Sequence, residues 1–167
     1  MKRHWKQAIK KVHDELEKSV ASRERQMDHR KNLGLQTISI VGYTNAGKTS
    51  LFNILTHKKH TVENALFATL DSTVGEIYMQ SLQKKVLISD TIGFIANLPP
   101  SLIEAFKSTL MESVRADIIL HVIDASDPLM VEKVRVVNEI LDQLTIAKEK
   151  VVLVFTKTDL DTRANTK

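Results

Sequence analysis

The sequence contains no cysteine, which excludes a disulfide framework and a zinc–thiolate site. It also lacks any run of about 18 apolar residues, so no membrane-spanning helix is expected. The first residues, Met1–Lys6, are basic and polar, and no apolar stretch follows them, so no secretory signal is expected either. These absences favour a reducing, cytoplasmic protein. With 43% hydrophobic and 26% charged residues, the 167-residue chain is long enough for one globular domain with a core.

Positive charge is concentrated at the N-terminus, although the whole chain carries only +4. Residues 1–33 contain ten Lys and Arg against five Asp and Glu, and residues 3–31 contain no glycine or proline. Apolar residues recur there at helical spacing, which predicts a long amphipathic helix ending at Asn32-Leu33-Gly34. Its apolar stripe is Trp5, Ile9, Val12, Leu16 and Val20. The basic face is typical of contact with RNA or another polyanion, or of a solvated helix surface.

The rest of the chain alternates between short apolar runs and amphipathic stretches. The apolar runs predict strands at Thr37–Val41, Thr73–Gln80, Lys84–Ser89, Asp117–Ile123 and Val151–Phe155, the last one buried. Helices are predicted to start near Lys48, to run from Pro99 to about Arg115, and to follow a cap at Asp127-Pro128. The last of these helices has the apolar set Leu129, Val134, Val137, Ile140, Leu141 and Leu144. Alternating strands and helices predict an α/β fold with a mainly parallel sheet.

The strongest motif follows the first of these strands. It matches G-x-x-x-x-G-K-[ST] in full, with the residues Gly42, Tyr43, Thr44, Asn45, Ala46, Gly47, Lys48 and Thr49. Glycines let such a loop turn tightly around phosphates, the lysine reaches the β- and γ-phosphates, and the threonine hydroxyl binds Mg²⁺. The helix that begins there points its positive end at the same anion. This motif predicts a P-loop nucleotide-binding protein.

Two further segments lie at predicted strand ends, where open α/β sheets bind ligands. Asp90 ends one strand and precedes Thr91, Ile92 and Gly93; we expect Asp90 to hold Mg²⁺ through water and the Gly93 backbone N–H to contact the γ-phosphate. The other segment is Thr156, Lys157, Thr158 and Asp159. An Asp there can accept hydrogen bonds from N1–H and the exocyclic amine of guanine. Adenine lacks this donor pair, so the site favours GTP over ATP.

A GTPase also needs a threonine in a switch segment between the phosphate loop and Asp90. The residues alone leave Thr61, Thr69 and Thr73 as candidates. The histidines form no metal-binding pair with a third ligand. His121, on an apolar strand, is interpreted as a core histidine with its hydrogen bonds satisfied.

Several runs resemble the HflX family of translation-associated GTPases. They are GYTNAGK (42–48), LFATLD (66–71), DTIGF (90–94), Leu98-Pro99, Glu104-Ala105-Phe106 and HVIDAS (121–126). The resemblance covers residues 35–160 and implies a Ras-like, three-layer α/β/α GTPase domain (35–167) after a helical-hairpin arm (1–33). It implies that Thr69 binds Mg²⁺ with Thr49, within a first switch of Phe67, Ala68, Thr69, Leu70 and Asp71. It implies catalytic roles for Lys48, Thr69 and Gly93, and association with the large ribosomal subunit to split or rescue ribosomes.

The sequence departs from the family pattern at three places. Thr156 stands where the family has Asn, the family's N-terminal domain is missing, and the chain stops soon after Asp159. A Ras-like sheet has six strands, so the last strand and helix are expected to be absent, leaving an apolar face uncovered beside Val151–Phe155. When complete, the protein is expected to be monomeric.

Two functional hypotheses follow from these observations. The first is a GTP-hydrolysing, ribosome-associated switch; Phe94 follows Gly93 where many GTPases have a water-positioning Gln, so hydrolysis is expected to be slow without a ribosome. The second is a truncated guanine-nucleotide-binding module with little or no hydrolysis. A P-loop ATPase or kinase is disfavoured by Asp159.

Overall fold

The computed structural model describes residues 21–22, 25–30, 32–58, 73–91, 93–94, 110 and 113–160. The chain divides into two compact units, Met1–Leu35 and Gln36–Lys167. In the first unit, residues 25–30 are helical. The helix ends in a turn in which the Leu33 N–H donates to His29 O and Gly34 has a φ of +67°. The predicted helix end at Asn32–Gly34 is thus confirmed, whereas the stripe from Trp5 to Val20 lies outside the described residues.

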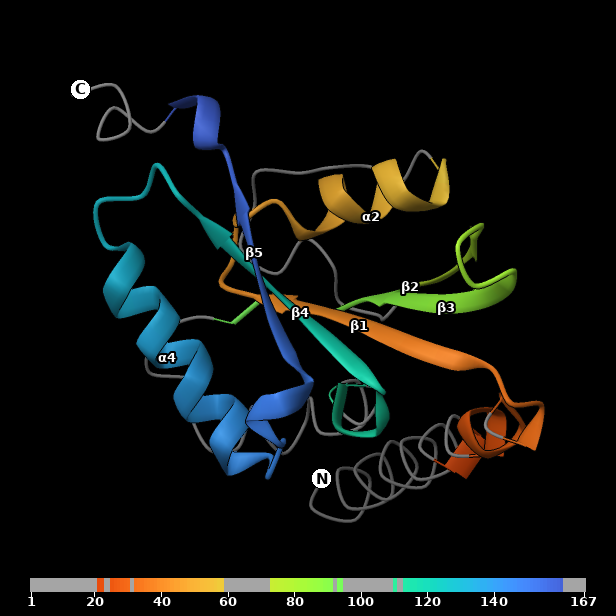
Figure 1. Cartoon of the computed structure of the whole chain (residues 1–167). Coiled ribbons are helices and arrows are strands. Elements are labelled where there is room, and N and C mark those ends of the chain that lie inside the picture. Colours follow the sequence, from red (N-terminus) through yellow and green to blue (C-terminus); the bar gives the residue numbers. More distant parts are fainter. Residues whose placement is uncertain are drawn as a thin grey trace, which may run out of the picture. The chain divides into compact units, whose positions relative to one another are not determined.

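The second unit is built on a five-stranded sheet in the order β2-β3-β1-β4-β5 (Figure 1). Strand β1 pairs in parallel with β3 and β4, β4 pairs in parallel with β5, and β2 is antiparallel to β3. The strands are β1 (Gln36–Gly42), β2 (Thr73–Met79), β3 (Lys84–Asp90), β4 (Ile118–Asp124) and β5 (Val151–Thr156). The mainly parallel sheet is as predicted, and it brings the C-terminal ends of β1, β3, β4 and β5 to one edge.

Helices cover both faces of this sheet. Helix α2 (Lys48–Thr56) places Phe52 in a core with Ile40 and Ile88, while α4 (Met130–Gln143) places Val137 in a core with Val41. Neighbouring β1 residues point to opposite faces, as period-two geometry requires. Two short 3₁₀ turns, η1 (Lys148–Lys150) and η2 (Thr158–Leu160), flank β5. The arrangement is the predicted α/β/α sandwich (Figure 1). Within the described part of the chain, every helix is too short or too polar to cross a membrane.

Two local predictions are corrected by the structure, and a third is described only in part. Strand β5 is not buried as a whole: the side chains of Val152, Leu153 and Phe155 are about half exposed (49%, 51% and 52%), because β5 is the outer strand of the described sheet and pairs only with β4. Helix α4 has Leu129, not Asp127, as its N-cap, and Leu129 is 52% exposed, outside the apolar face. Of the helix predicted from Pro99 to Arg115, only residues 110 and 113–115 are described, and they are helical.

Candidate functional site

The phosphate loop leaves the end of β1 in a conformation that depends on two glycines. A Cβ at Gly42 would overlap the carbonyl oxygen of Val122 on β4, so no larger residue fits there. Gly47 has a φ of +90° and precedes α2 without a side-chain cap. The first turn of α2 also contains no acidic residue. The uncapped N–H groups and the positive end of α2 therefore remain available for an anion.

A second contact fixes the mouth of the loop. The Thr44 N–H donates to Phe94 O (2.8 Å), and the Phe94 N–H donates to Gly42 O (3.0 Å). This bridge joins the phosphate loop to the segment after β3. Gly93 lies close beneath it, since a Cβ there would lie 2.8 Å from Lys48 Nζ and 2.8 Å from Thr44 Cγ2. The absence of a side chain at Gly93 thus leaves room for the lysine ammonium.

Lys48 is a buried cation inside the loop. Only 7% of the residue is exposed, and its Nζ donates to Tyr43 O at 2.9 Å. Burial lowers the pKa of Lys48 to about 8, against the opposing effect of the Asp90 charge. A buried ammonium whose charge is poorly compensated attracts an anion. The burial and position of Lys48 are consistent with its predicted role in phosphate binding.

Thr49 and Asp90 meet where β3 ends beside the start of α2. The Thr49 hydroxyl donates to Asp90 Oδ2 at 2.7 Å, and Asp90 is 2% exposed. One hydroxyl and one carboxylate fit Mg²⁺, which binds few protein ligands and takes the rest from water and substrate phosphates. Across the described residues, no cluster of three His, Asp or Glu side chains offers an alternative metal site. The adjacent Thr91 hydroxyl instead donates to Ile40 O (2.6 Å), a structural contact.

The end of β5 and the segment that follows it are tied directly to the phosphate loop. The Thr156 hydroxyl lies 2.7 Å from Ala46 O and 3.1 Å from Ile123 O. Lys157, which has a φ of +54°, donates from Nζ to Asn45 O at 3.0 Å. Asp159 follows in η2 and is exposed. The structure thus brings Thr156 and Lys157, two of the residues predicted for base recognition, into contact with the phosphate loop.

Three residues of this neighbourhood, Asp124, Asp127 and Lys133, were not predicted as site residues from the sequence. Lys157 forms an ion pair with Asp124 (2.7 Å) at the end of β4. Lys133 of α4 forms an ion pair with Asp127, and its Nζ lies 4.9 Å from the centre of the Tyr43 ring. The Asp-x-x-Asp spacing after an apolar strand was the available signal, because such residues often accept backbone N–H groups in turns.

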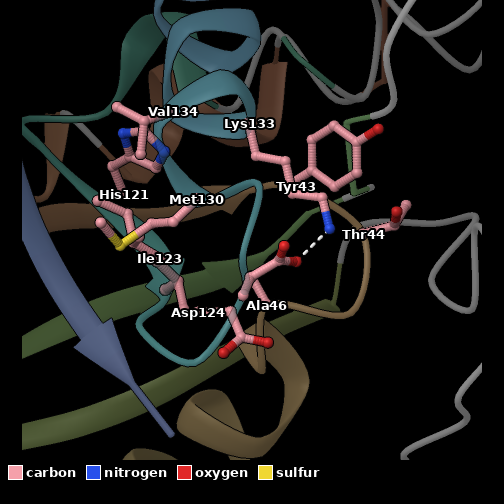
Figure 2. Close-up of a pocket in the computed structure, with 11 residues that line it drawn as sticks. Tyr43, Thr44, Ala46, His121, Ile123, Asp124, Met130, Lys133 and Val134 are labelled. Carbon is pink, nitrogen blue, oxygen red and sulfur yellow. Dashed lines mark hydrogen bonds and ion pairs between the residues drawn. The ribbon is translucent and has the colours of Figure 1, made fainter. Parts of the chain in front are cut away.

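A small pocket opens behind the phosphate loop, between β4 and α4 (Figure 2). It is lined by Tyr43, Thr44, Ala46, His121, Val122, Ile123, Asp124, Asp127, Met130, Lys133 and Val134. His121 is 1% exposed, and its Nδ1 has no hydrogen-bond partner among the described residues. The prediction of a satisfied histidine is therefore wrong. Burial lowers the pKa of His121 to about 4, so the ring is neutral near pH 7.

Two groups of predicted site residues lie outside the described residues. They are Ile92 and the first switch, Phe67, Ala68, Thr69, Leu70 and Asp71. Of the other two candidate switch threonines, Thr61 also lies outside the described residues, whereas Thr73 is the first residue of β2. The choice of Thr69 remains a prediction.

Comparison with known proteins places the chain among GTPases. Residues 37–157 match the family described as 50S ribosome-binding GTPase. The chain is 43% identical over 159 residues to GTPase HflX of Caldanaerobacter subterraneus subsp. tengcongensis and 40% identical over 152 residues to GTPase HflX of Escherichia coli. These matches cover 95% and 91% of the chain but 37% and 35% of the relatives. The chain therefore spans about a third of their length.

Solved structures agree with this result. A GTP-binding protein from the hyperthermophilic archaeon Sulfolobus solfataricus, in complex with GDP, matches with a TM-score of 0.64 and 30% identity, over 94% of this chain and 43% of that chain. The mGMPPNP-bound NFeoB from S. thermophilus matches with a TM-score of 0.60 and 26% identity, over 79% of this chain and 48% of that one. The resemblance and the Ras-like fold predicted from the sequence are confirmed.

Proposed function

Because the chain belongs to the family of 50S ribosome-binding GTPases, we propose that it binds guanine nucleotides and hydrolyses GTP to GDP and phosphate. The observation that carries the proposal is the buried Lys48 inside a phosphate loop, beside the Thr49–Asp90 contact. Phosphoryl transfer depends on positioning and charge neutralisation, and these residues provide cationic and N–H groups for both.

The proposed roles follow the geometry of the site. Lys48 and the N–H groups of residues 47–49, at the uncapped start of α2, bind phosphate oxygens, and the Gly93 N–H contacts the terminal phosphate. Thr49, with Thr69 and an Asp90-held water, would hold Mg²⁺, which neutralises phosphate charge when bound. Asp159 accepts hydrogen bonds from guanine, and the Lys157 stem lies along the base. Thr156 retains one function of an amide at its position by binding Ala46 O.

We propose that the chain alone hydrolyses GTP slowly. Phe94 is 2% exposed, and its backbone is occupied by Gly42 and Thr44, so this residue offers no group that can orient the attacking water. Orientation of the attacking water is assigned to a partner, the large ribosomal subunit, because the description of the matching family names 50S ribosome binding. The basic segment 1–33 is the proposed contact with ribosomal RNA, and the cytoplasm is the corresponding location.

The second candidate is a guanine-nucleotide-binding module without useful hydrolysis. It is favoured by Phe94, which offers no group to orient water. It is also favoured by the half-exposed side chains of β5, because they show that this side of the sheet is not covered by other described residues. Both candidates bind GDP, and only the first turns over GTP.

Binding is tested by titrating a fluorescent GDP analogue in the presence of Mg²⁺ and competing it with GTP and ATP. Displacement by GTP but not by ATP is expected, and Asp159→Ala should abolish that preference. Hydrolysis is then followed in a single turnover with and without large ribosomal subunits. Stimulation by subunits supports the first candidate, whereas tight binding without turnover in either condition supports the second. Failure of the wild-type chain to bind GDP would refute both.

A further inference from the structure

Two aspartates that lie three residues apart, one at the end of β4 and one in the connection to α4, each form an ion pair with a lysine. Asp124 pairs with Lys157 at 2.7 Å, and Asp127 pairs with Lys133. The four side chains are partly buried, with 15% and 16% of the two aspartates and 31% and 30% of the two lysines exposed. Partial burial reduces solvent screening, so these pairs are stronger than fully exposed ones.

Each aspartate is held in place by its own turn. Asp124 Oδ1 accepts the Ser126 N–H at 3.0 Å and the Ser126 hydroxyl at 2.7 Å. Asp127 Oδ1 accepts the Leu129 N–H at 2.8 Å. In both residues the other carboxylate oxygen, Oδ2, points to the lysine. The connection therefore presents two oriented negative charges, and the lysines take their positions from it.

Each lysine in turn contacts the phosphate loop. Lys157 donates to Asn45 O at 3.0 Å. The Lys133 ammonium lies 4.9 Å from the centre of the Tyr43 ring, and Figure 2 shows the two side chains next to each other. Tyr43 and Asn45 flank Thr44, so the two contacts hold the phosphate loop on either side of this residue. Asn45 has a φ of +62°, a left-handed conformation that costs energy in a non-glycine residue. A loop held in this conformation benefits from external support.

We propose that Asp124 and Asp127 are positioning residues that use Lys157 and Lys133 to hold the phosphate loop in its nucleotide-binding shape. We call the four side chains the double clamp. The proposal rests on the proposed function, because a pre-formed loop matters only to a chain that binds nucleotide. The double clamp lowers the ordering cost of binding and slows release. Neither aspartate contacts the nucleotide.

The test measures the dissociation rate of a fluorescent GDP analogue from the full 167-residue chain. Asp127→Asn keeps the size and the acceptor for the Leu129 N–H but removes the charge that holds Lys133. It is expected to raise the dissociation rate about fivefold, the effect of a partly buried ion pair. Asp124→Asn should act similarly through Lys157. Glu139→Gln, an exposed acid on α4, is the matched control and should leave the rate unchanged.

Double variants separate positioning from a general structural effect. If Asp127 acts through Lys133, Asp127→Asn should change the rate less than twofold in a Lys133→Met background, by the logic of a double-mutant cycle. Lys133→Arg keeps the cation and its ring contact and should dissociate GDP like the wild type. Urea midpoints of all variants are measured in parallel. If Asp127→Asn lowers the urea midpoint, the dissociation rate of Lys133→Met is compared with that of the wild type instead, because this variant leaves the hydrogen bonds within the connection intact.

The outcomes are distinct for the two proposals. A wild-type chain that does not bind GDP defeats the proposed function itself. A wild-type chain that binds GDP, with variants that release it at the same rate, overturns the double clamp alone. Effects of Asp127→Asn and Lys133→Met that multiply in the double variant overturn it too, because the two residues would then act independently.

Discussion

Lys48 is the residue through which nucleotide binding is expected to depend on pH. Its folded-state pKa of about 8 lies below the ordinary 10.5, so between these values the unfolded chain holds a proton that the nucleotide-free folded chain has lost. Stability of the empty protein should therefore rise with pH through this window, by linkage. A bound phosphate reverses the preference, because it stabilises the ammonium.

We therefore expect GDP affinity to fall as pH rises above about 8, by at most about tenfold per pH unit. Binding near pH 8.5 should take up a proton. Calorimetry in two buffers of different ionisation enthalpy measures that uptake, and dissociation constants from pH 6.5 to 9.5 give the profile. A flat profile without proton uptake would show that Lys48 stays charged throughout or does not contact the phosphates.

His121 is expected to make the folding stability of the protein depend on pH in the acid range. Its folded-state pKa of about 4 lies below the ordinary 6.5, so on acidification the unfolded chain takes up a proton first. Folding stability should fall from about pH 6.5 to about pH 4, beyond what the carboxylates cause. The charged groups lining the same pocket, Asp124, Asp127 and Lys133, are already engaged in ion pairs.

Replacing His121 by Leu should remove this part of the acid sensitivity. It should also leave stability at pH 7 unchanged or raise it by about 1 kcal/mol, since an unpartnered buried nitrogen is lost. Urea unfolding of both proteins at pH 7, 6 and 5 is the measurement. Parallel loss of stability in the two proteins would mean that the protonated His121 ring donates to a hydrogen-bond acceptor in the native state.

Most of the elements were predictable because their signals are local. Strand β1 follows from an apolar run, and α2 begins at Lys48 because the phosphate-loop motif requires it. Contacts set by topology were not predictable: Asp124 and Lys157 lie 33 residues apart and meet only because β4 and β5 pair in parallel. The exposure of β5 depends on what covers the sheet rather than on its own apolar composition.

The packing of α2 against β2 depends on one glycine. A Cβ at Gly75 would overlap Thr56 Cγ2 and lie 3.0 Å from Phe52 Cζ. Gly75→Ala should destabilise the fold by about 1–3 kcal/mol, the cost of overpacking. Thr56→Ala removes the overlapping methyl group, so the double variant should be more stable than the sum of the single effects. Urea midpoints test this, and strict additivity would mean that the helix shifts away without strain.

At the scale of the whole molecule, the apolar surface of β5 affects behaviour in solution. Exposed apolar side chains on a sheet-edge strand promote association between chains. Leu153→Thr, with the neighbouring Val152→Thr, keeps β propensity while removing exposed apolar area. The double variant should stay monomeric to higher concentration in sedimentation velocity, with stability within about 0.5 kcal/mol of the wild type, the usual range for surface substitutions. A large loss of stability would show that these side chains are packed in solution.

Nucleotide binding should stabilise the second unit as a whole, because the site joins the ends of β1, β3 and β5. GDP at a hundred times its dissociation constant contributes about 2.7 kcal/mol. For a chain of this size that raises the melting temperature by roughly 5–10 °C. ATP at the same concentration should raise it far less, if Asp159 selects the base as proposed. Hydrogen exchange should show protection at residues 42–49 and 156–159 but not at 25–30, which belong to the other compact unit. Equal protection at residues 25–30 would mean that the two units respond to the nucleotide together, and an equal shift with ATP would mean that the phosphates alone determine binding.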